Sequence, residues 1–230
     1  MARISYVGPL RSRPERSYQW PGSSPDSVGR DGENTVAALL ARSDGDFHSR
    51  IGYWLQHMGV VDGFAIGAVD ADRDLYELTV TAPGGTTPVS LIDVGFGVSQ
   101  VLPVVVQVFY AAADSSVILE QPEMHLHPAA QSALGDVLLA AVQQNNVQLL
   151  VETHSEHLLH RIQRRIAEET LSNDDVALYF VETADSKSQL RELTVDTYGN
   201  ITNWPQDFFG DEMGDLAEMT RAAARRRQRP

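Results

Sequence analysis

The second half of the chain alternates between short apolar runs and longer amphipathic ones. The apolar runs, which predict buried strands, are 116–120, 146–153 and 176–182. The amphipathic runs, which predict helices, are 99–113, 128–144 and 155–169. Pro103 would fall in the first turn of the first of these helices, where proline is tolerated. Continuous apolar strands separated by helices favour a parallel sheet, so we predict an α/β fold.

The first half of the chain carries weaker signals. Residues 1–33 are rich in Gly, Pro, Ser and Arg and predict irregular backbone. Helices are expected over 34–42 and 47–60, and strands over 64–69, 75–82 and 88–94.

The C-terminal end returns to β signals, and its pattern predicts strands over 190–196 and 199–201 and a last helix near 213–227. From these elements we expect three parts in the chain. They are an N-terminal segment at 1–87, an α/β core at 88–185, and a C-terminal extension of β structure and helix at 186–230.

Composition narrows the class of protein. The 230 residues include no cysteine, which excludes disulfides and cysteine-based zinc sites. The chain has no apolar run near the roughly 18 residues that cross a bilayer and no secretory signal, so we expect a cytoplasmic protein. A net charge of −13 disfavours nucleic acid binding across the whole surface. The arginine-rich segment 221–229 favours a solvated helix end, and the alternative is a patch for nucleic acid or an acidic partner.

Acidic and amide side chains follow the apolar run at 116–120. The run ends in Glu120, and Gln121 and Glu123 come directly after it. In a parallel sheet, ligands bind at the carboxyl ends of the strands. A carboxylate at that edge can hold Mg²⁺, often through water. The alternative is a strand that ends in an ordinary solvated turn.

A histidine ends the next apolar run. His154 could contact a γ-phosphate or orient an attacking water. Thr153 or Ser155 is expected to cap the helix that follows. The two roles are compatible, because capping and chemistry would use different residues.

A glycine-containing loop precedes the predicted helix at 99–113. Gly95 and Gly97 would let the backbone approach a ligand closely. Ser99 and the free N–H groups of the helix start could form an anion site, which the helix dipole would reinforce. Taken alone, the segment could equally be an ordinary turn between a strand and a helix.

The order of these motifs resembles the ABC-type ATPase heads of the SMC-like and OLD-like families. In particular, E-Q-P-E-M-H-L-H-P is similar to the Walker B segment of an AAA-like subgroup of bacterial ATPases. The resemblance covers about 88–182 and implies a P-loop NTPase fold that binds ATP and Mg²⁺. The positions that it assigns to the signature loop are Gly97, Val98, Ser99 and Gln100.

The resemblance also implies roles for residues in the later motifs. Glu120 would stand at the Mg²⁺-linked acid, Gln121 at the catalytic glutamate, and His154 at the switch histidine. His125 and His127 would lie in the D-loop.

Two departures from the family pattern affect the chemistry. Glu120 replaces the more usual aspartate, and Gln121 cannot accept a proton as a carboxylate could. Glu123 is the nearest candidate base in the sequence. A zinc site is the less favoured alternative for the four histidines of this region, which are His125, His127, His154 and His157.

The sequence holds no P-loop. That motif needs a lysine after spaced glycines, and the single lysine, Lys187, lies in a predicted surface turn. The resemblance therefore implies a fragment, or one subunit of a split ATPase, whose partner is a P-loop-bearing chain or a second head. It also suggests links to nucleic acid, to a nuclease effector or to phage defence. The alternative is an inactive interaction module that kept the fold.

Overall fold

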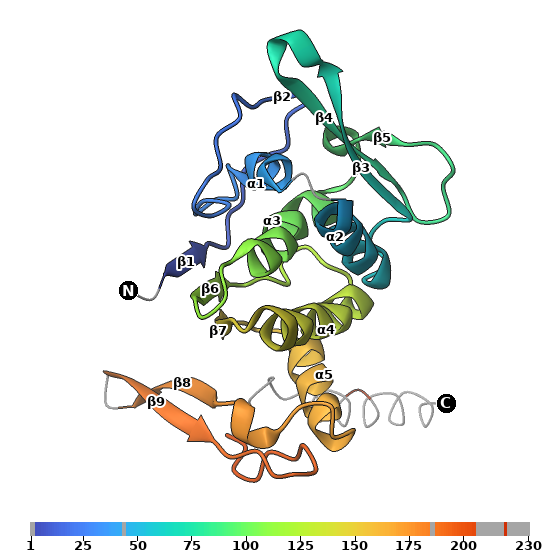
Figure 1. Ribbon diagram of the computed structural model, residues 1–230. Helices are drawn as coiled ribbons and strands as arrows, with labels where there is room; N and C mark the ends of the chain where they lie inside the picture. Colours follow the sequence, from blue (N-terminus) through green and yellow to red (C-terminus); the bar gives the residue numbers. More distant parts are fainter. Residues whose placement is uncertain (1–2, 43–44, 185–186, 206–218, 220–230) are drawn as a thin grey trace, which may run out of the picture. The chain divides into compact units, whose positions relative to one another are not determined.

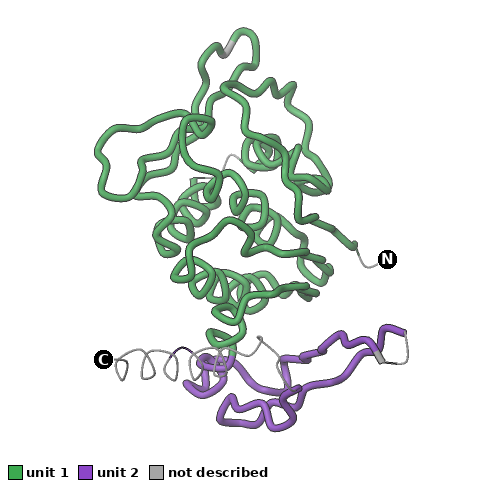
Figure 2. The backbone as a smooth tube through the Cα atoms, turned by 180° about the vertical axis from the view of Figure 1, so that it is seen from behind, with its two compact units in different colours: residues 1–162 green, residues 163–230 purple. Residues whose placement is uncertain are grey.

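The computed structural model describes the chain except for residues 1–2, 43–44, 185–186, 206–218 and 220–230 (Figure 1). It divides into two compact units, 1–162 and 163–230, and the boundary falls inside a helix (Figure 2). The expected boundaries at 87 and 185 differ from this division and stay predictions. Each unit is described by itself.

A parallel sheet lies at the centre of the first unit. Its strands are β1 (Ile4–Val7), β6 (Ser116–Glu120) and β7 (Gln148–Glu152), in the order β1-β6-β7. Both pairings are parallel, with Val7 opposite Leu119 and Glu120 opposite Glu152. The predicted α/β fold with a parallel sheet is therefore confirmed, and all three strands end at the same edge.

Two helices of this unit, α3 (Phe96–Tyr110) and α4 (Pro128–Asn145), contact the strands of the parallel sheet. A further helix, α5 (Glu156–Ala167), follows β7 and begins in this unit. Val117 and Leu119 of β6 are fully buried in the resulting core. Pro128 occupies the first turn of α4, as its fixed φ favours.

A second, antiparallel sheet belongs to the same unit. It contains β2 (Tyr18–Gln19), β4 (Leu75–Thr81) and β3 (Gly63–Asp70) in that order, and β5 (Val89–Ser90) pairs with β4. The helices α1 (Thr35–Ala41) and α2 (Gly45–His57) precede β3. The predicted strand pair at 64–69 and 75–82 is thus confirmed as a hairpin.

Two expectations about strands were wrong. Residues 1–33 are not wholly irregular, because β1 joins the parallel sheet at 4–7. The run at 176–182 does not form a third buried strand. It lies largely in β8 (Leu178–Ala184), which pairs antiparallel with β9 (Lys187–Leu193) in the second unit. Its apolar side chains alternate between half-buried and exposed positions, as in a two-stranded sheet.

The helix α3 begins earlier than its pattern predicted. Its first residue is Phe96, so Pro103 lies inside the helix and not in its first turn. The pyrrolidine ring packs against Gly32, where a side chain would place its Cβ within 2.6 Å of the Pro103 Cγ. The expected strand over 88–94 is also short, because a 3₁₀ turn (Leu91–Asp93) follows Ser90.

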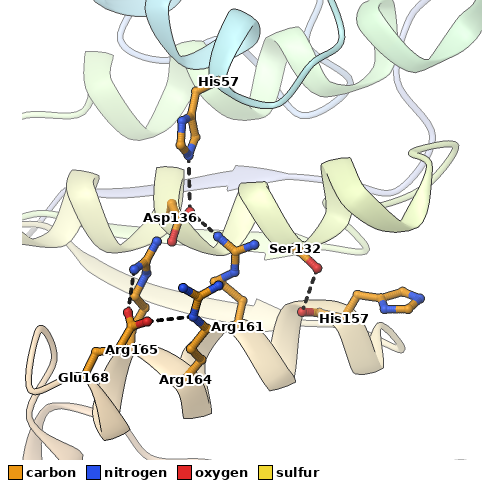
Figure 3. A network of polar contacts seen from close by, with 8 residues as sticks. All are labelled: His57, Ser132, Asp136, His157, Arg161, Arg164, Arg165 and Glu168. Atoms are coloured by element: carbon orange, nitrogen blue, oxygen red, sulfur yellow. Dashed lines mark hydrogen bonds and ion pairs between the residues drawn. The ribbon is translucent and has the colours of Figure 1, made fainter.

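A polar network joins three helices of the first unit (Figure 3). The carboxylate of Asp136 on α4 accepts from the Arg161 guanidinium of α5 and lies 3.2 Å from the Nε2 atom of His57 on α2. Gly135 lets α4 and α5 approach closely, because a Cβ there would lie 3.0 Å from the Arg161 Cγ. The network fixes α5, the helix that follows β7.

The second unit contains β8, β9 and an isolated antiparallel bridge between Val195 and Ile201. The Gln163 side-chain amide donates to the carbonyl of Gly199 at 2.7 Å. The predicted last helix near 213–227 lies almost entirely outside the described residues. Among the residues that are described, each helix is too short or too polar to cross a lipid bilayer.

Candidate functional site

The loops that follow β1, β6 and β7 meet at the carboxyl edge of the parallel sheet. This is the edge at which ligands bind in open α/β sheets. The structure brings together there the four predicted catalytic residues, which are Glu120, Gln121, Glu123 and His154.

Glu120 lies at the end of β6, on the sheet face opposite the one that α3 and α4 cover. The Tyr6 hydroxyl hydrogen-bonds to its carboxylate, and this bond raises the pKa of Tyr6 above its ordinary value. Arg30 stacks over the Tyr6 ring at 5.5 Å. Mg²⁺ in nucleotide sites takes one or two carboxylates plus water and phosphate oxygens, so the single carboxylate of Glu120 fits that ion.

Gln121 occupies a strained turn after the strand. Its φ is 44°, which is unusual for a residue with a side chain, and its N–H donates to the Glu152 carbonyl at 2.9 Å. The Nη2 atom of Arg11 donates to the carbonyls of Glu120 and Gln121, at 3.0 and 3.2 Å. The turn is therefore held from the end of β7 and from the loop that follows β1.

Glu123 points into the protein. Only 7% of the residue is exposed, and its Oε1 atom accepts the backbone N–H of His154 at 3.0 Å. A general base needs to reach the water that attacks the nucleotide. The position of Glu123 favours a role in holding His154 over the suggested role as a base.

His154 lies exposed at the edge, with 79% of its side chain accessible to solvent. Its Nε2 atom lies 3.2 Å from Oε1 of Glu152, the last residue of β7. Ser155 caps α5, because its hydroxyl accepts the N–H of Leu158 at 3.1 Å, which confirms one of the two expected caps.

The segment expected to be a glycine loop is the first turn of α3. Gly95 is the N-cap, and Ser99 is 5% exposed with its hydroxyl bonded to the Phe96 carbonyl at 2.9 Å. Val98 and Gln100 are buried as well. The groups this turn presents to a ligand are thus backbone N–H groups, since the first turn of a helix leaves them unpaired.

The D-loop residues adjoin that helix start. His125 has a φ of 65°, its ring lies 6.2 Å from the Phe96 ring, and its carbonyl would be 3.2 Å from a Cβ at Gly97. His127 caps α4 through its Nδ1 atom, which accepts from Ala129 at 3.4 Å. Within the described ranges, three or more metal-ligating side chains nowhere come together, so the zinc alternative gains no support.

Three residues of the site were not found from the sequence. Tyr6, Arg11 and Arg30 all come from the segment that was expected to be irregular. The available signal was the short β-prone segment Ile4–Val7, which contains Tyr6 and leads into the loop that carries Arg11.

Two family models match the chain. Residues 58–159 match the AAA ATPase domain, a range that includes the α3 start, the β6 turn and His154. Residues 171–219 match a family described as a protein of unknown function, DUF3696. None of the curated proteins matches significantly.

Solved SMC heads share the fold. One comes from work on ATP-driven dimerization and DNA-stimulated activation of SMC ATPases, with a TM-score of 0.50 and 12% identity over 79% of this chain and 96% of that one. Another is the Smc head with an extended coiled coil bound to ScpA from Pyrococcus furiosus, with a TM-score of 0.50 and 12% identity over 82% and 40%. The SmcHead bound to the C-winged helix domain of ScpA matches with a TM-score of 0.50 and 12% identity, over 69% of this chain and 46% of that one.

These findings confirm the resemblance drawn from the motifs. Residues 58–159 are similar to the AAA ATPase domain, and the chain shares its α/β fold with SMC heads. It spans less than half the length of two of the heads that it matches.

Proposed function

We propose that this chain supplies one side of a composite ATP site in an SMC-like ATPase head. Its P-loop would come from another polypeptide or another segment, because Lys187 is the only lysine of the sequence. The observation that carries the proposal is the meeting of Glu120 and His154 at one sheet edge, beside an open sheet face.

The open face exposes apolar side chains among polar ones. Ile4 of β1 and Leu150 of β7 expose 69% and 63% of their surface, and Ile118 of β6 pairs with Tyr6 of β1 and with Leu150 of β7. Parallel sheets are normally covered on both faces. A layer that brings the P-loop would cover these residues and reach Glu120 and Tyr6, which share this face.

The roles follow from the positions of the side chains. Glu120 would hold Mg²⁺, and the bound ion would neutralise charge on the phosphates. His154 would contact the γ-phosphate or orient the attacking water. The first turn of α3 contains Gly95, Gly97 and Ser99, and the family resemblance assigns Ser99 to the signature loop. This turn would face a nucleotide held by a second head. Ser99 can reach it only if its hydroxyl leaves the Phe96 carbonyl.

A non-catalytic interaction module is the second candidate. Gln121 favours it, because its amide stands where the family resemblance places the catalytic glutamate. Partners beyond the second head, such as nucleic acid or a nuclease effector, and a cytoplasmic, defence-linked role stay predictions.

Sedimentation with a P-loop-bearing head polypeptide tests the proposal. A first choice of partner is the product of the gene next to that of this chain. A non-hydrolysable ATP analogue with Mg²⁺ should tighten association, because a ligand that bridges two chains stabilises only the joined state. His154→Ala should assemble normally and turn over more slowly. Equal association with and without the analogue would support the inactive module instead.

A further inference from the structure

Each strand of the parallel sheet is followed by one member of a connected group. Arg11 follows β1, Glu123 follows β6 and His154 follows β7. Arg11 donates to the carbonyls of Glu120 and Gln121, and Glu123 accepts the N–H of His154. All these contacts end on backbone atoms of the candidate catalytic residues.

Both charged side chains are buried. Arg11 and Glu123 are each 7% exposed, although both come from loops. Burial lowers the pKa of Arg11 to about 10, and the negative charge of Glu123 opposes that change. In the described part of the chain, Nε and Nη1 of Arg11 and Oε2 of Glu123 have no hydrogen-bond partner.

Such burial is unfavourable for stability. A buried charge with unused hydrogen-bonding capacity costs free energy unless its remaining contacts compensate. The forked, planar guanidinium is suited to hold two adjacent carbonyls, and a carboxylate makes a strong bond to an amide N–H. The contacts that compensate here fix Glu120, Gln121 and His154.

We propose that Arg11 and Glu123 are positioning residues that hold the Glu120–Gln121 turn and the His154 loop as one unit. Arg11 fixes the turn from the β1 side through the Glu120 and Gln121 carbonyls. The turn joins the His154 loop, because the Gln121 N–H donates to the Glu152 carbonyl at 2.9 Å. Glu123, two residues later, accepts the His154 N–H. This inference rests on the proposed ATPase function, but its structural part can be tested on the isolated chain.

The first test measures hydrogen exchange and the chemical shift of the His154 amide by NMR. Glu123→Ala removes the acceptor and should speed exchange about tenfold or more. Glu123→Gln keeps an acceptor oxygen and should restore most of the protection. Arg11→Gln should also speed His154 exchange, although Arg11 does not touch His154. The matched control is Arg13→Gln, which removes the same charge from an exposed position of the same loop.

The outcomes are distinct. Unchanged His154 exchange in Arg11→Gln would overturn the coupling, and so would a uniform increase across the sheet, which indicates global destabilisation. Neither result depends on nucleotide or on a partner. The exchange test therefore decides the coupling even if no P-loop polypeptide binds the chain.

The second test uses the assembled ATPase. Arg11→Gln should lower kcat at least about tenfold with little change in KM for ATP, because positioning acts on the reacting geometry. Arg13→Gln should match the wild type. Equal kcat for Arg11→Gln and wild type would overturn the positioning role while leaving the composite site intact.

Discussion

Replacing Gly95 by aspartate should separate stability from nucleotide-dependent assembly. Gly95 is the N-cap of α3, with φ −62° and ψ 161°, and has no side-chain cap. A Cβ at this position would meet no atom within 4 Å. Aspartate is a preferred N-cap residue, and replacing glycine reduces the freedom of the unfolded chain. We expect the free energy of unfolding to rise by about 0.5–1 kcal/mol.

The same carboxylate would oppose a phosphate at the helix start. Two unit charges 4 Å apart repel by about 4 kcal/mol at an effective dielectric constant near 20. Since about 1.4 kcal/mol changes an equilibrium constant tenfold, the gain in association from the ATP analogue should fall at least about 100-fold. A variant that is more stable and yet cannot assemble is hard to explain by misfolding.

The assay combines urea unfolding of the chain with sedimentation of the mixture. Gly95→Asn is the matched control, because asparagine caps a helix as well as aspartate does and carries no charge. It should share the gain in stability and lose much less of the association. If Gly95→Asp assembles with the analogue as tightly as Gly95→Asn does, the α3 start is not a phosphate site and the reasoning is refuted.

Three further predictions concern the chain and its assembly. The isolated chain should bind ATP with a Kd no better than about 1 mM, and calorimetry that finds micromolar binding would contradict the composite site. Gln121→Glu should raise hydrolysis in the assembled complex by about 10²–10⁴-fold, and an unchanged rate would show that another group already serves as the base. Asp136→Asn should lower the free energy of unfolding by about 3 kcal/mol in urea titration, because it leaves Arg161 without its charged partner, and no loss would mean that solvent replaces the contact.

The elements with strong local signals were predicted well. The strand β6 and the start of α4 have the predicted limits, because an acid ends the apolar run and Pro128 fixes the first helical residue. The capping role of Ser155 also depends only on nearby residues. In each case, the information that sets the structure lies within a few residues of the chain.

The errors came from elements that depend on distant partners. The strand β1 is four residues long and exists because β6 lies beside it. The start of α3 was misplaced because its glycines suggested a loop, whereas Phe96 and Gly97 are helical and pack near His125. Propensity is a weak signal that tertiary contacts override.

In the candidate site, too, features set by nearby residues could be predicted, and features that depend on distant contacts could not. Glu120 and His154 could be predicted because each ends an apolar run, and the ends of parallel strands meet at one edge. The burial of Arg11 could not, since its sequence context is a loop with three arginines that reads as a solvated charged segment. Only the fold shows that one of the three points inward.

The fold gives different surroundings to three similar side chains that lie within four residues. Glu120 faces the open side of the sheet beside Tyr6, Gln121 sits in the left-handed turn, and Glu123 points inward to the N–H of His154.

If the assembled head hydrolyses ATP as proposed, the attacking water needs a proton acceptor, and neither the amide of Gln121 nor the buried carboxylate of Glu123 is placed to serve. Among the described residues of this edge, His154 is exposed and lies beside the Glu152 carboxylate. If Nε2 donates to that carboxylate, Nδ1 becomes the acceptor of the ring, which is the tautomer that a general base requires. An active assembly with Gln121 intact would therefore depend on the same His154 loop that Glu123 holds in place.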